Sequence, residues 1–435
     1  MEKILVKSGQ KLSGQVDISA AKNSVLPIIA ASILSDEKVI IKNYPSLNDV
    51  RVLTEVLYDI GCDISMDEIN YDLQIDPTNI KKYTANCELV KKMRASFLVM
   101  GPMLAKYKKF TLSCPGGCNI GTRPIDLHLK GFEALGAKIV QEHGFIEIIG
   151  ENLKGNEIYL DFPSVGATEN IMMAASRIEG RTVINNPALE PEIEDLANFL
   201  NSMGAKVQFN INSTIIIDGV KSLKGTTYQP IYDRIEAGTF MVAAAITNST
   251  IQINGVEEEH LKPVIQKLIE SGSEITIDSK TKIAIVKGPK EIIPTDIITR
   301  PHPGYPTDMQ SQMMSLLAIA NGNCNIEETV FENRFMNVAE LSRMGADIKI
   351  KGNTSIITGV KKLTGCQVKA SDLRSGAALI LAGLVAEGYT EIEDIYHIDR
   401  GYMNIEDKFS KLGAQIYRVK WDKWVKNLLT YFYIM

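Results

Sequence analysis

The sequence predicts an α/β protein made of two similar globules, in which apolar helices are enclosed by sheet and a cleft separates the globules. Three observations lead to this fold class. The chain has 435 residues, which is too long for one ordinary hydrophobic core. One sequence motif recurs six times at a nearly constant interval, and six helical stretches are apolar on almost every face.

The repeated motif is a glycine that separates a helical stretch from a strand. Its six copies read IGCDI, LGAKI, MGAKV, SGSEI, MGADI and LGAQI, centred on Gly61, Gly136, Gly204, Gly272, Gly345 and Gly413. A fixed period of about 70 residues indicates one supersecondary unit that is copied along the chain. Glycine after a helix supplies a left-handed cap, so we expect each unit to run strand, helix, strand, second helix and hairpin, a βαβαββ-like order.

Each predicted unit contains one apolar helix and one amphipathic helix. The apolar stretches are SVLPIIAASIL, RASFLVMGPMLA, ATENIMMAASRI, GTFMVAAAIT, DMQSQMMSLLAIA and SGAALILAGLVA. A helix that is apolar nearly all round is buried, whereas amphipathic stretches such as EIEDLANFLNSM face water on one side. Six buried helices surrounded by sheet therefore predict two globules of three units each.

Composition and charge narrow the class of function. Apolar residues make up 45% of the chain and charged residues 23%, with a net charge of -5. This balance is typical of a globular enzyme and argues against general nucleic-acid binding, which needs a basic surface. No apolar run approaches the roughly 18 residues of a membrane helix, and the N-terminus lacks a signal-peptide pattern. The five histidines contain no i,i+4 pair, so no metal site is expected.

Basic residues recur at the predicted helix starts. The first helices begin near Lys22, Arg94, Arg234 and Arg374, and the second helices near Arg123, Arg334 and Arg400. Taken singly, each would be a solvated surface charge. However, cations at a helix N-terminus oppose the helix dipole, and such ends attract anions. Several of them converging on one cleft predict a site for a polyanionic ligand.

The segment CPGGCNIGTRP at 114–124 is expected to be a loop, because its glycines and prolines leave no helical or strand period. Cys118 lies five residues before Arg123, and a nearby cation in an open loop stabilises a thiolate. A chemical role and an inert buried thiol both remain open for Cys118 on this reasoning.

Asp308 stands at the start of the fifth apolar helix, where Thr307 and Gln310 predict a capping box. The simplest interpretation is that its carboxylate complements the helix dipole. A carboxylate beside many cations could instead act as a general base. The sequence contains no Walker A motif, no dinucleotide-binding glycine motif and no Gly-x-Ser-x-Gly elbow.

Long motifs of the chain resemble the UDP-N-acetylglucosamine 1-carboxyvinyltransferase family of enolpyruvyl transferases. The similarity covers about residues 1–419 and includes AKN at 21–23, MRAS at 93–96, PGGC and the following IGTRP, SVGAT at 164–168, EPEI at 190–193, DRIE at 233–236, PTDMQ at 306–310, FENRFM at 331–336 and HIDRG at 397–401. The resemblance implies a two-domain inside-out α/β barrel with an active-site cleft between the domains. The expected domains are 22–231 and 1–21 with 232–420, followed by an atypical tail at 421–435.

The resemblance also implies an activity and a set of site residues. The family transfers the enolpyruvyl group of phosphoenolpyruvate to the 3'-hydroxyl of UDP-N-acetylglucosamine in cytoplasmic peptidoglycan synthesis, and it needs no metal or organic cofactor. It has small-molecule partners, and neither nucleic acid nor membrane insertion is expected. By the family pattern, Cys118, the thiol captured by fosfomycin, is the general acid, and Asp308 is the base. The residues expected to bind phosphoenolpyruvate are Lys22, Asn23, Arg123 and Arg400, those for the sugar nucleotide are Arg94, Arg123, Pro124, Ile125, Asp126, Leu127, Ser164, Val165, Gly166, Asp308 and Val330, and the supporting residues are Arg334, Asp372 and Arg374.

Two positions depart from the family pattern, and two other functions compete with it. Asn48 and Phe162 stand where lysine is common in the family, which weakens two expected contacts.

The shikimate-pathway enolpyruvyl transferase shares the architecture, but it is not expected to carry the PGGC loop. A weakly active paralogue with a regulatory role is the other alternative, and the complete set of expected catalytic residues argues against it.

Overall fold

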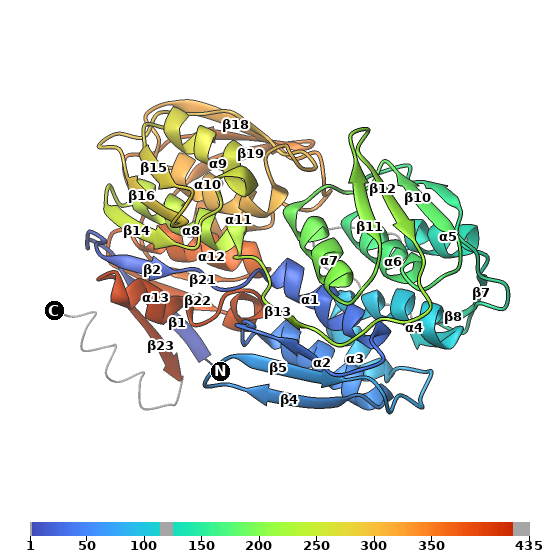
Figure 1. Ribbon diagram of the computed structural model, residues 1–435. Coiled ribbons are helices and arrows are strands. Elements are labelled where there is room, and N and C mark those ends of the chain that lie inside the picture. Colours follow the sequence, from blue (N-terminus) through green and yellow to red (C-terminus); the bar gives the residue numbers. More distant parts are fainter. Residues whose placement is uncertain (1, 114–124, 421–435) are drawn as a thin grey trace.

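The structure is a computed structural model that describes residues 2–113 and 125–420 (Figure 1). Its helices and strands form six units with a common plan, and the helices of each unit pack against one small sheet. Five sheets have four strands, and the sheet of the second unit has three, in the order β6-β8-β7. The predicted sixfold repeat is therefore confirmed.

The first three units form one group. The first contains β13 (Thr227–Tyr228), α1 (Lys22–Ala31), η1 (Ser32–Leu34), β3 (Val39–Ile41), α2 (Asn48–Ile60), β4 (Asp63–Asp67) and β5 (Asp72–Asp76). The second contains α3 (Cys87–Lys92), η2 (Arg94–Val99), α4 (Met100–Tyr107), β6 (Lys109–Ser113), α5 (Asp126–Ala134), β7 (Lys138–Glu142) and β8 (Phe145–Ile149). The third contains β9 (Glu157–Tyr159), α6 (Val165–Ala175), β10 (Arg181–Asn185), α7 (Pro191–Ser202), β11 (Val207–Asn210) and β12 (Thr214–Asp218).

The last three units form the other group. The fourth contains β2 (Gln15–Asp17), α8 (Arg234–Ile246), β14 (Thr250–Asn254), α9 (Glu258–Glu270), β15 (Glu274–Asp278) and β16 (Ile283–Lys287). The fifth contains β17 (Ile297–Ile298), η3 (Thr307–Met309), α10 (Gln310–Leu317), β18 (Asn323–Glu327), α11 (Asn337–Arg343), β19 (Asp347–Lys351) and β20 (Thr354–Thr358). The sixth contains β21 (Gln367–Lys369), α12 (Leu373–Gly383), β22 (Tyr389–Glu393), η4 (Ile395–Arg400), α13 (Ile405–Lys411), β23 (Gln415–Lys420) and the N-terminal strand β1 (Glu2–Lys7).

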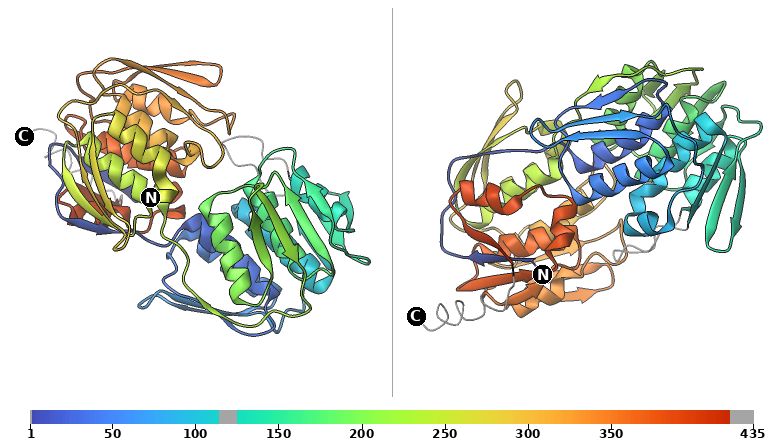
Figure 2. Two further views of the ribbon diagram at one scale, coloured as in Figure 1. Left: turned by 45° about the horizontal axis from the view of Figure 1, so that its top comes forward. Right: turned by 90° about the horizontal axis from the view of Figure 1, so that it is seen from below.

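Each group encloses its own hydrophobic core. One core draws its buried side chains from residues 20–223, and the other draws them from residues 4–18 and 235–416. The first helices of the units lie at the centre, and every residue of α8 and of α10 is buried. We call these groups the first and the second globule, and they lie side by side in Figure 2. The domain boundaries at 21/22 and 231/232 stay a prediction, because two packed cores do not show that either part folds by itself.

Two short segments carry the chain between the globules, and each follows a strand that completes the sheet of a unit distant in the sequence. We call the region of these two segments the junction. Strand β2 precedes α1 in the chain but pairs in parallel with β14 of the second globule. Strand β13 follows the first globule's third unit but pairs in parallel with β3 of its first unit. The two connecting segments pair with each other: Ala21 N donates to Ile231 O and Asp233 N donates to Ser19 O, both at 2.8 Å. The globules are thus joined by a paired double crossing.

The six repeated glycines have the backbone conformation that the sequence predicts. Their φ angles lie between +92° and +114°, a region that side chains with a Cβ atom rarely adopt. Each follows a second helix, and Gly61 is the cap of α2. The recurring glycine is therefore a steric requirement of the unit, which ends a helix and turns the chain into its hairpin.

This geometry predicts a graded loss of stability on substitution by alanine. Gly204→Ala, where a Cβ atom would meet open space, should lower the free energy of unfolding of the first globule by about 1–2 kcal/mol, the cost of a left-handed backbone. Gly61→Ala should cost more, because its Cβ atom would lie 2.8 Å from the backbone oxygen of Asn79. Urea unfolding of both variants checks this, and equal stability of Gly204→Ala and the unchanged protein would contradict it.

Candidate active site

The expected site residues lie at the N-terminal ends of buried helices. Lys22 begins α1, Arg234 begins α8, Arg374 is the second residue of α12, and Asp308 lies in the turn before α10. The apolar bodies of these helices are buried in the two hydrophobic cores, and their polar first turns lie at the junction between the globules. None of the three cations is a solvated surface charge, since each is buried. For these residues the surface interpretation is therefore wrong.

Asp308 is held between two buried guanidinium groups. Arg334 Nη2 donates to Oδ1 at 2.6 Å and Arg374 Nη2 donates to Oδ2 at 2.8 Å. The arginine side chains are 3% and 4% exposed, whereas that of Asp308 is 26% exposed. The two cations therefore fix the carboxylate, and the Asp308 side chain stays partly exposed. A carboxylate offers about four acceptor positions, so these two ion pairs are compatible with a further hydroxyl donor.

The guanidinium group of Arg374 lies over the aromatic ring of Tyr402. The guanidinium carbon lies 5.5 Å from the centroid of the Tyr402 ring, and the Tyr402 hydroxyl lies 2.8 Å from Thr239 Oγ1. Burial would lower the pKa of Arg374, but the charge and hydrogen bond of Asp308, together with Tyr402 and Asp233, outweigh it and the pKa is raised. Asp372 caps α12 by accepting from the backbone N–H of Arg374 and of Ser375. Arg374 is thus charged and rigidly placed.

The predicted capping box at the start of α10 is wrong. Thr307 Oγ1 donates instead to Glu328 Oε2 at 2.8 Å, and no side chain caps either η3 or α10. Glu328 also accepts from the backbone N–H of Val330, which ties the segment after β18 to the turn that carries Asp308. The hydroxyl therefore stabilises a tertiary contact rather than its own helix.

A second carboxylate, Asp49, joins two expected phosphoenolpyruvate ligands. Lys22 Nζ lies 2.6 Å from Asp49 Oδ2, and Arg400 donates to both oxygens, from Nε at 2.9 Å and from Nη2 at 3.3 Å. Asp49 belongs to α2 of the first globule and Arg400 to η4 of the second, so this pair crosses the junction. Sequence analysis missed Asp49; its position beside Asn48, at a repeated helix start, was the available signal.

Burial and charge act in opposite directions on this pair. Burial lowers the pKa of Lys22, and the neighbouring Arg400 and Arg374 lower it further, while Asp49 acts to raise it. Burial would raise the pKa of Asp49, but Lys22 and Arg400 outweigh it, and that pKa is lowered. Asp49 therefore supports the charged form of Lys22 in a place where burial opposes it.

Asp233 fixes the junction immediately behind Lys22. It caps α8 by accepting from the N–H groups of Ile235 and Glu236, and it accepts from the backbone N–H of Lys22 at 3.2 Å. One side chain thus holds the starts of α8 and of α1, which belong to different globules. Burial raises the pKa of Asp233, although the charge of Arg374 opposes this.

Three carboxylates, those of Glu169, Glu190 and Glu192, border the junction on the side of α7, and we call them the acidic wall. Arg234 forms a bidentate pair with Glu192, at 2.9 and 3.1 Å, across the two globules. Glu190 accepts from the backbone N–H of His302. Glu169 of α6 is fully enclosed, and burial, followed by the charges of Glu192 and Glu190, raises its pKa well above its ordinary value. Of these three carboxylates, Glu192 has both of its oxygens bound to one cation, Arg234.

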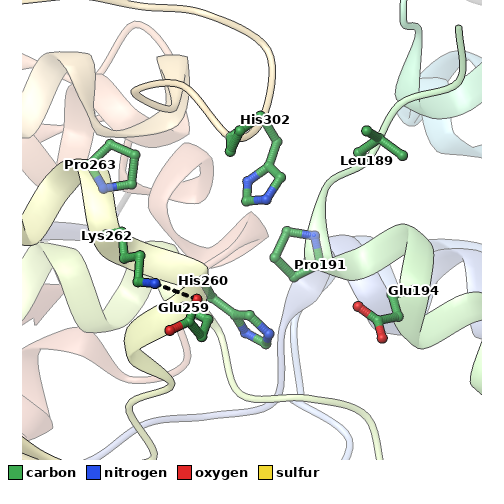
Figure 3. A pocket seen from close by; sticks show the side chains of 9 residues that line it. Leu189, Pro191, Glu194, Glu259, His260, Lys262, Pro263 and His302 are labelled. Atoms are coloured by element: carbon green, nitrogen blue, oxygen red, sulfur yellow. Dashed lines mark ion pairs between the residues drawn. The ribbon is translucent and has the colours of Figure 1, made fainter. Parts of the chain in front are cut away.

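A cavity of about 350 Å3 opens beside this wall (Figure 3). Its lining comes from both globules and comprises Leu189, Pro191, Glu194, Glu259, His260, Lys262, Pro263, His302 and Pro303. Lys262 and Glu259 pair with each other at 2.6 Å, and the two imidazoles extend from the second globule towards Pro191. Burial lowers the pKa of His302 to about 4, so this ring is neutral at pH 7. The cavity lies outside the expected substrate residues.

The residues expected to bind the sugar nucleotide lie at the starts of α5 and α6. Ile125, Asp126 and Leu127 open α5, and Ser164 caps α6 ahead of Val165 and Gly166. These two helix starts are adjacent, because a Cβ atom on Gly166 would lie 3.0 Å from the ring of His128. Phe162, which replaces the family lysine, is 43% exposed.

Several expected residues cannot be placed. Cys118, Arg123 and Pro124 lie outside the described residues, and nothing is described of the Arg94 side chain. Asn23 follows Lys22 in α1 and is half-buried. The described structure therefore brings together Lys22 and Arg400 on Asp49, and Arg334 and Arg374 on Asp308, with Asp372 capping the helix of Arg374. The helix starts near Ser164 and Asp126 adjoin each other.

Across 2–113 and 125–420, no set of three or more His, Cys, Asp or Glu side chains is arranged to bind a metal ion. No helix in this part of the chain combines the length and the apolar character that a membrane crossing requires.

Comparison with known structures defines the fold. The enolpyruvyl transferase NikO from Streptomyces tendae superimposes with a TM-score of 0.88 at 23% identity, covering 97% of this chain and 99% of that one. EPSP synthase from Acinetobacter baumannii gives a TM-score of 0.75 at 20% identity, covering 96% and 100%. At these identities the likeness concerns the fold, which is that of the enolpyruvyl transferases.

Sequence comparison defines the family. The family model described as EPSP synthase (3-phosphoshikimate 1-carboxyvinyltransferase) matches residues 6–409. UDP-N-acetylglucosamine 1-carboxyvinyltransferase 1 of Clostridium acetobutylicum is 59% identical over 420 residues, which are 97% of this chain and 100% of that protein. The corresponding enzyme 1 of Clostridium perfringens is 60% identical over 421 residues, covering 96% and 100%. The chain belongs to the UDP-N-acetylglucosamine 1-carboxyvinyltransferase family.

The shared carboxylate predicts the effect of Asp49→Asn. Without its negative charge, the pKa of Lys22 should fall further, so the alkaline limb of the pH profile of kcat/KM for phosphoenolpyruvate should move to lower pH. The value of kcat/KM at pH 7 should fall by about one to two decades, as expected for losing a hydrogen-bonded charge. Steady-state kinetics between pH 6 and 10 test this, and an unmoved alkaline limb would refute the coupling.

Proposed function

We propose that this protein transfers the enolpyruvyl group of phosphoenolpyruvate to the 3'-hydroxyl of UDP-N-acetylglucosamine and releases phosphate, in the cytoplasm, as the first committed step of peptidoglycan synthesis. The observation that carries this proposal is the pair of carboxylate-centred clusters at the junction. Asp49 gathers Lys22 and Arg400, and Asp308 lies between Arg334 and Arg374. Full-length relatives with this name support it at 53–60% identity.

The first cluster suits a small dianionic or trianionic substrate. Phosphoenolpyruvate carries a phosphate and a carboxylate close together, and Lys22, Arg400 and Arg123 would neutralise them, with Asn23 as a further donor. Guanidinium groups match both anions with paired hydrogen bonds. Lys22 and Arg400 come from different globules, so binding of the substrate would also hold the globules together.

The second cluster suits deprotonation of a hydroxyl. Asp308 would accept the proton of the 3'-hydroxyl as its oxygen attacks C2 of phosphoenolpyruvate, while Cys118 would donate a proton to C3. The C2–phosphate bond then breaks, a C3 proton leaves, and the double bond is restored in the product. Preorganised cations stabilise the anionic phosphate as it departs, which is where charge grows in the transition state.

The sugar nucleotide would lie against the starts of α5 and α6. The assigned residues Ile125 to Leu127 and Ser164 to Gly166 present backbone N–H groups at two adjacent helix N-termini, which attract a diphosphate. Arg94, Arg123, Pro124 and Val330 complete the set implied by the family. Asp372, Arg334 and Arg374 would act as support for Asp308 and for the cleft.

A phosphate-release assay tests the proposed reaction directly. The purified full chain should release phosphate only when both phosphoenolpyruvate and UDP-N-acetylglucosamine are present. Release with shikimate 3-phosphate in place of the sugar nucleotide would instead favour the other enolpyruvyl transferase. No release with either acceptor, from protein that binds UDP-N-acetylglucosamine, would favour the regulatory alternative.

Asp308→Asn should bind the sugar nucleotide normally but lower turnover by about two to four decades, the contribution expected of a positioned general base. The amide keeps the shape of the side chain but cannot accept the hydroxyl proton. Calorimetric binding of UDP-N-acetylglucosamine and the phosphate-release rate separate the two effects. Near-normal turnover would return Asp308 to the role of complementing the helix dipole.

Substitutions at Cys118 distinguish proton donation from nucleophilic attack. Cys118→Asp should retain substantial turnover, because a carboxylic acid can donate a proton, whereas Cys118→Ser should lose nearly all of it, because a hydroxyl is far too weak an acid. Intact-mass spectrometry should show that fosfomycin labels the unchanged protein and neither variant. An active serine variant would refute the acid role.

A further inference from the structure

One arginine on the outer sheet of the second globule binds three carboxylates at once. Arg418 of β23 donates to both oxygens of Asp399, at 2.6 and 3.0 Å. It also donates to both oxygens of Glu406, at 2.5 and 3.3 Å, and to Glu2 at 3.2 Å. The guanidinium therefore joins β1 to the end of η4 and to the first turn of α13.

The two strongest of these contacts bracket a short segment that reaches the active site. Asp399 precedes Arg400, whose guanidinium pairs with Asp49 of the first globule. Tyr402 supports Arg374, which in turn binds Asp308. The residues between Asp399 and Glu406 thus serve both carboxylate-centred clusters, although Arg418 touches neither.

The backbone of this segment depends on outside contacts for its position. It begins as the 3-10 helix η4, a form that is stable only in short pieces, and φ is positive at Asp394 before it and at Asn404 within it. Asn404 then caps α13 without a side-chain hydrogen bond. Side chains therefore hold much of this segment in place: Tyr402 and Ile405 are buried in the second core, and Asp399 and Glu406 bind Arg418.

We infer that Arg418 is a positioning residue for phosphoenolpyruvate: by holding Asp399 and Glu406 on one guanidinium, it fixes the segment 399–406 and places Arg400 at the substrate anion. This inference rests on the proposed function, in which Arg400 binds phosphoenolpyruvate. Arg418 itself lies outside the expected substrate contacts, and its effect should fall on phosphoenolpyruvate alone.

The planar fork of arginine explains why this role needs arginine. Its donors point in fixed directions and can satisfy two carboxylates side by side, whereas a lysine ammonium is a single point charge. Hydrogen bonding with Asp399, together with the nearby carboxylates, raises the pKa of Arg418 despite its burial. Loss of the fork would leave Asp399 free to turn towards its neighbour Arg400, which is a competing cation.

The test compares Arg418→Gln with a matched control on the first globule. Arg181 forms a similar bidentate pair with Asp218, at 2.8 and 2.9 Å, on strands far from the junction. In Arg418→Gln, the KM for phosphoenolpyruvate should rise about tenfold, a loss of about 1.4 kcal/mol, while the KM for UDP-N-acetylglucosamine should stay within about twofold. Arg181→Gln should leave both KM values unchanged, and Arg418→Lys should resemble Arg418→Gln.

A second variant covers the case in which Arg418→Gln folds poorly. Asp399→Asn keeps the size of the side chain and one acceptor oxygen, and it should raise the KM for phosphoenolpyruvate in the same direction but by less. A larger KM for this substrate alone supports the inference. Unchanged KM values, or an equal change in both, in a folded variant would overturn it.

The same experiment separates this inference from the proposed function. If the unchanged protein releases no phosphate from the two substrates, the proposed function fails whatever the variants do. If the unchanged protein turns over and the KM for phosphoenolpyruvate is the same in both Arg418 variants and in Asp399→Asn, the reaction stands and only the positioning role is lost.

Discussion

Compensation of buried charge is the constraint on which the junction depends. Removing an ion from water costs several kcal/mol unless a partner and further hydrogen bonds replace its hydration. The buried cations meet this cost through three carboxylates: Asp49, Asp308 and Glu192. Two of these, Asp49 and Glu192, bind a cation of the opposite globule. The ion pairs of Asp49 and Glu192 therefore compensate buried charge and also orient the two globules relative to each other.

The apolar repeat is what makes such a concentration of charge possible. Each first helix is buried along its body, so its polar residues can lie only at its ends. The starts of α1, α8, α10 and α12 lie at the junction, and the double crossing at residues 19–21 and 231–233 joins the two globules there. The fold thus gathers helix N-termini and cations at the junction.

Sequence reasoning predicted features that depend on local sterics and on apolar periodicity. The six glycines and the buried helices follow from the intolerance of a Cβ atom at positive φ and from uninterrupted apolar stretches. The partners of the cations were not predictable in this way, because Asp49 and Arg400 are 351 residues apart in the chain. Thr307 illustrates the converse. Its local pattern predicted a helix cap, but its hydroxyl donates a hydrogen bond to a distant carboxylate, that of Glu328.

The place of β1 has a consequence for the order in which the protein can form during synthesis. This strand is synthesised before every other strand that the structure describes, yet its partners are β22 and β23, and Glu2 pairs with Lys420. The second globule therefore starts before the first and finishes after it, since every residue of the first core is made in between. Until β22 and β23 are synthesised, the apolar side chains of β1 have no sheet to join, which is the kind of exposed edge that chaperones protect.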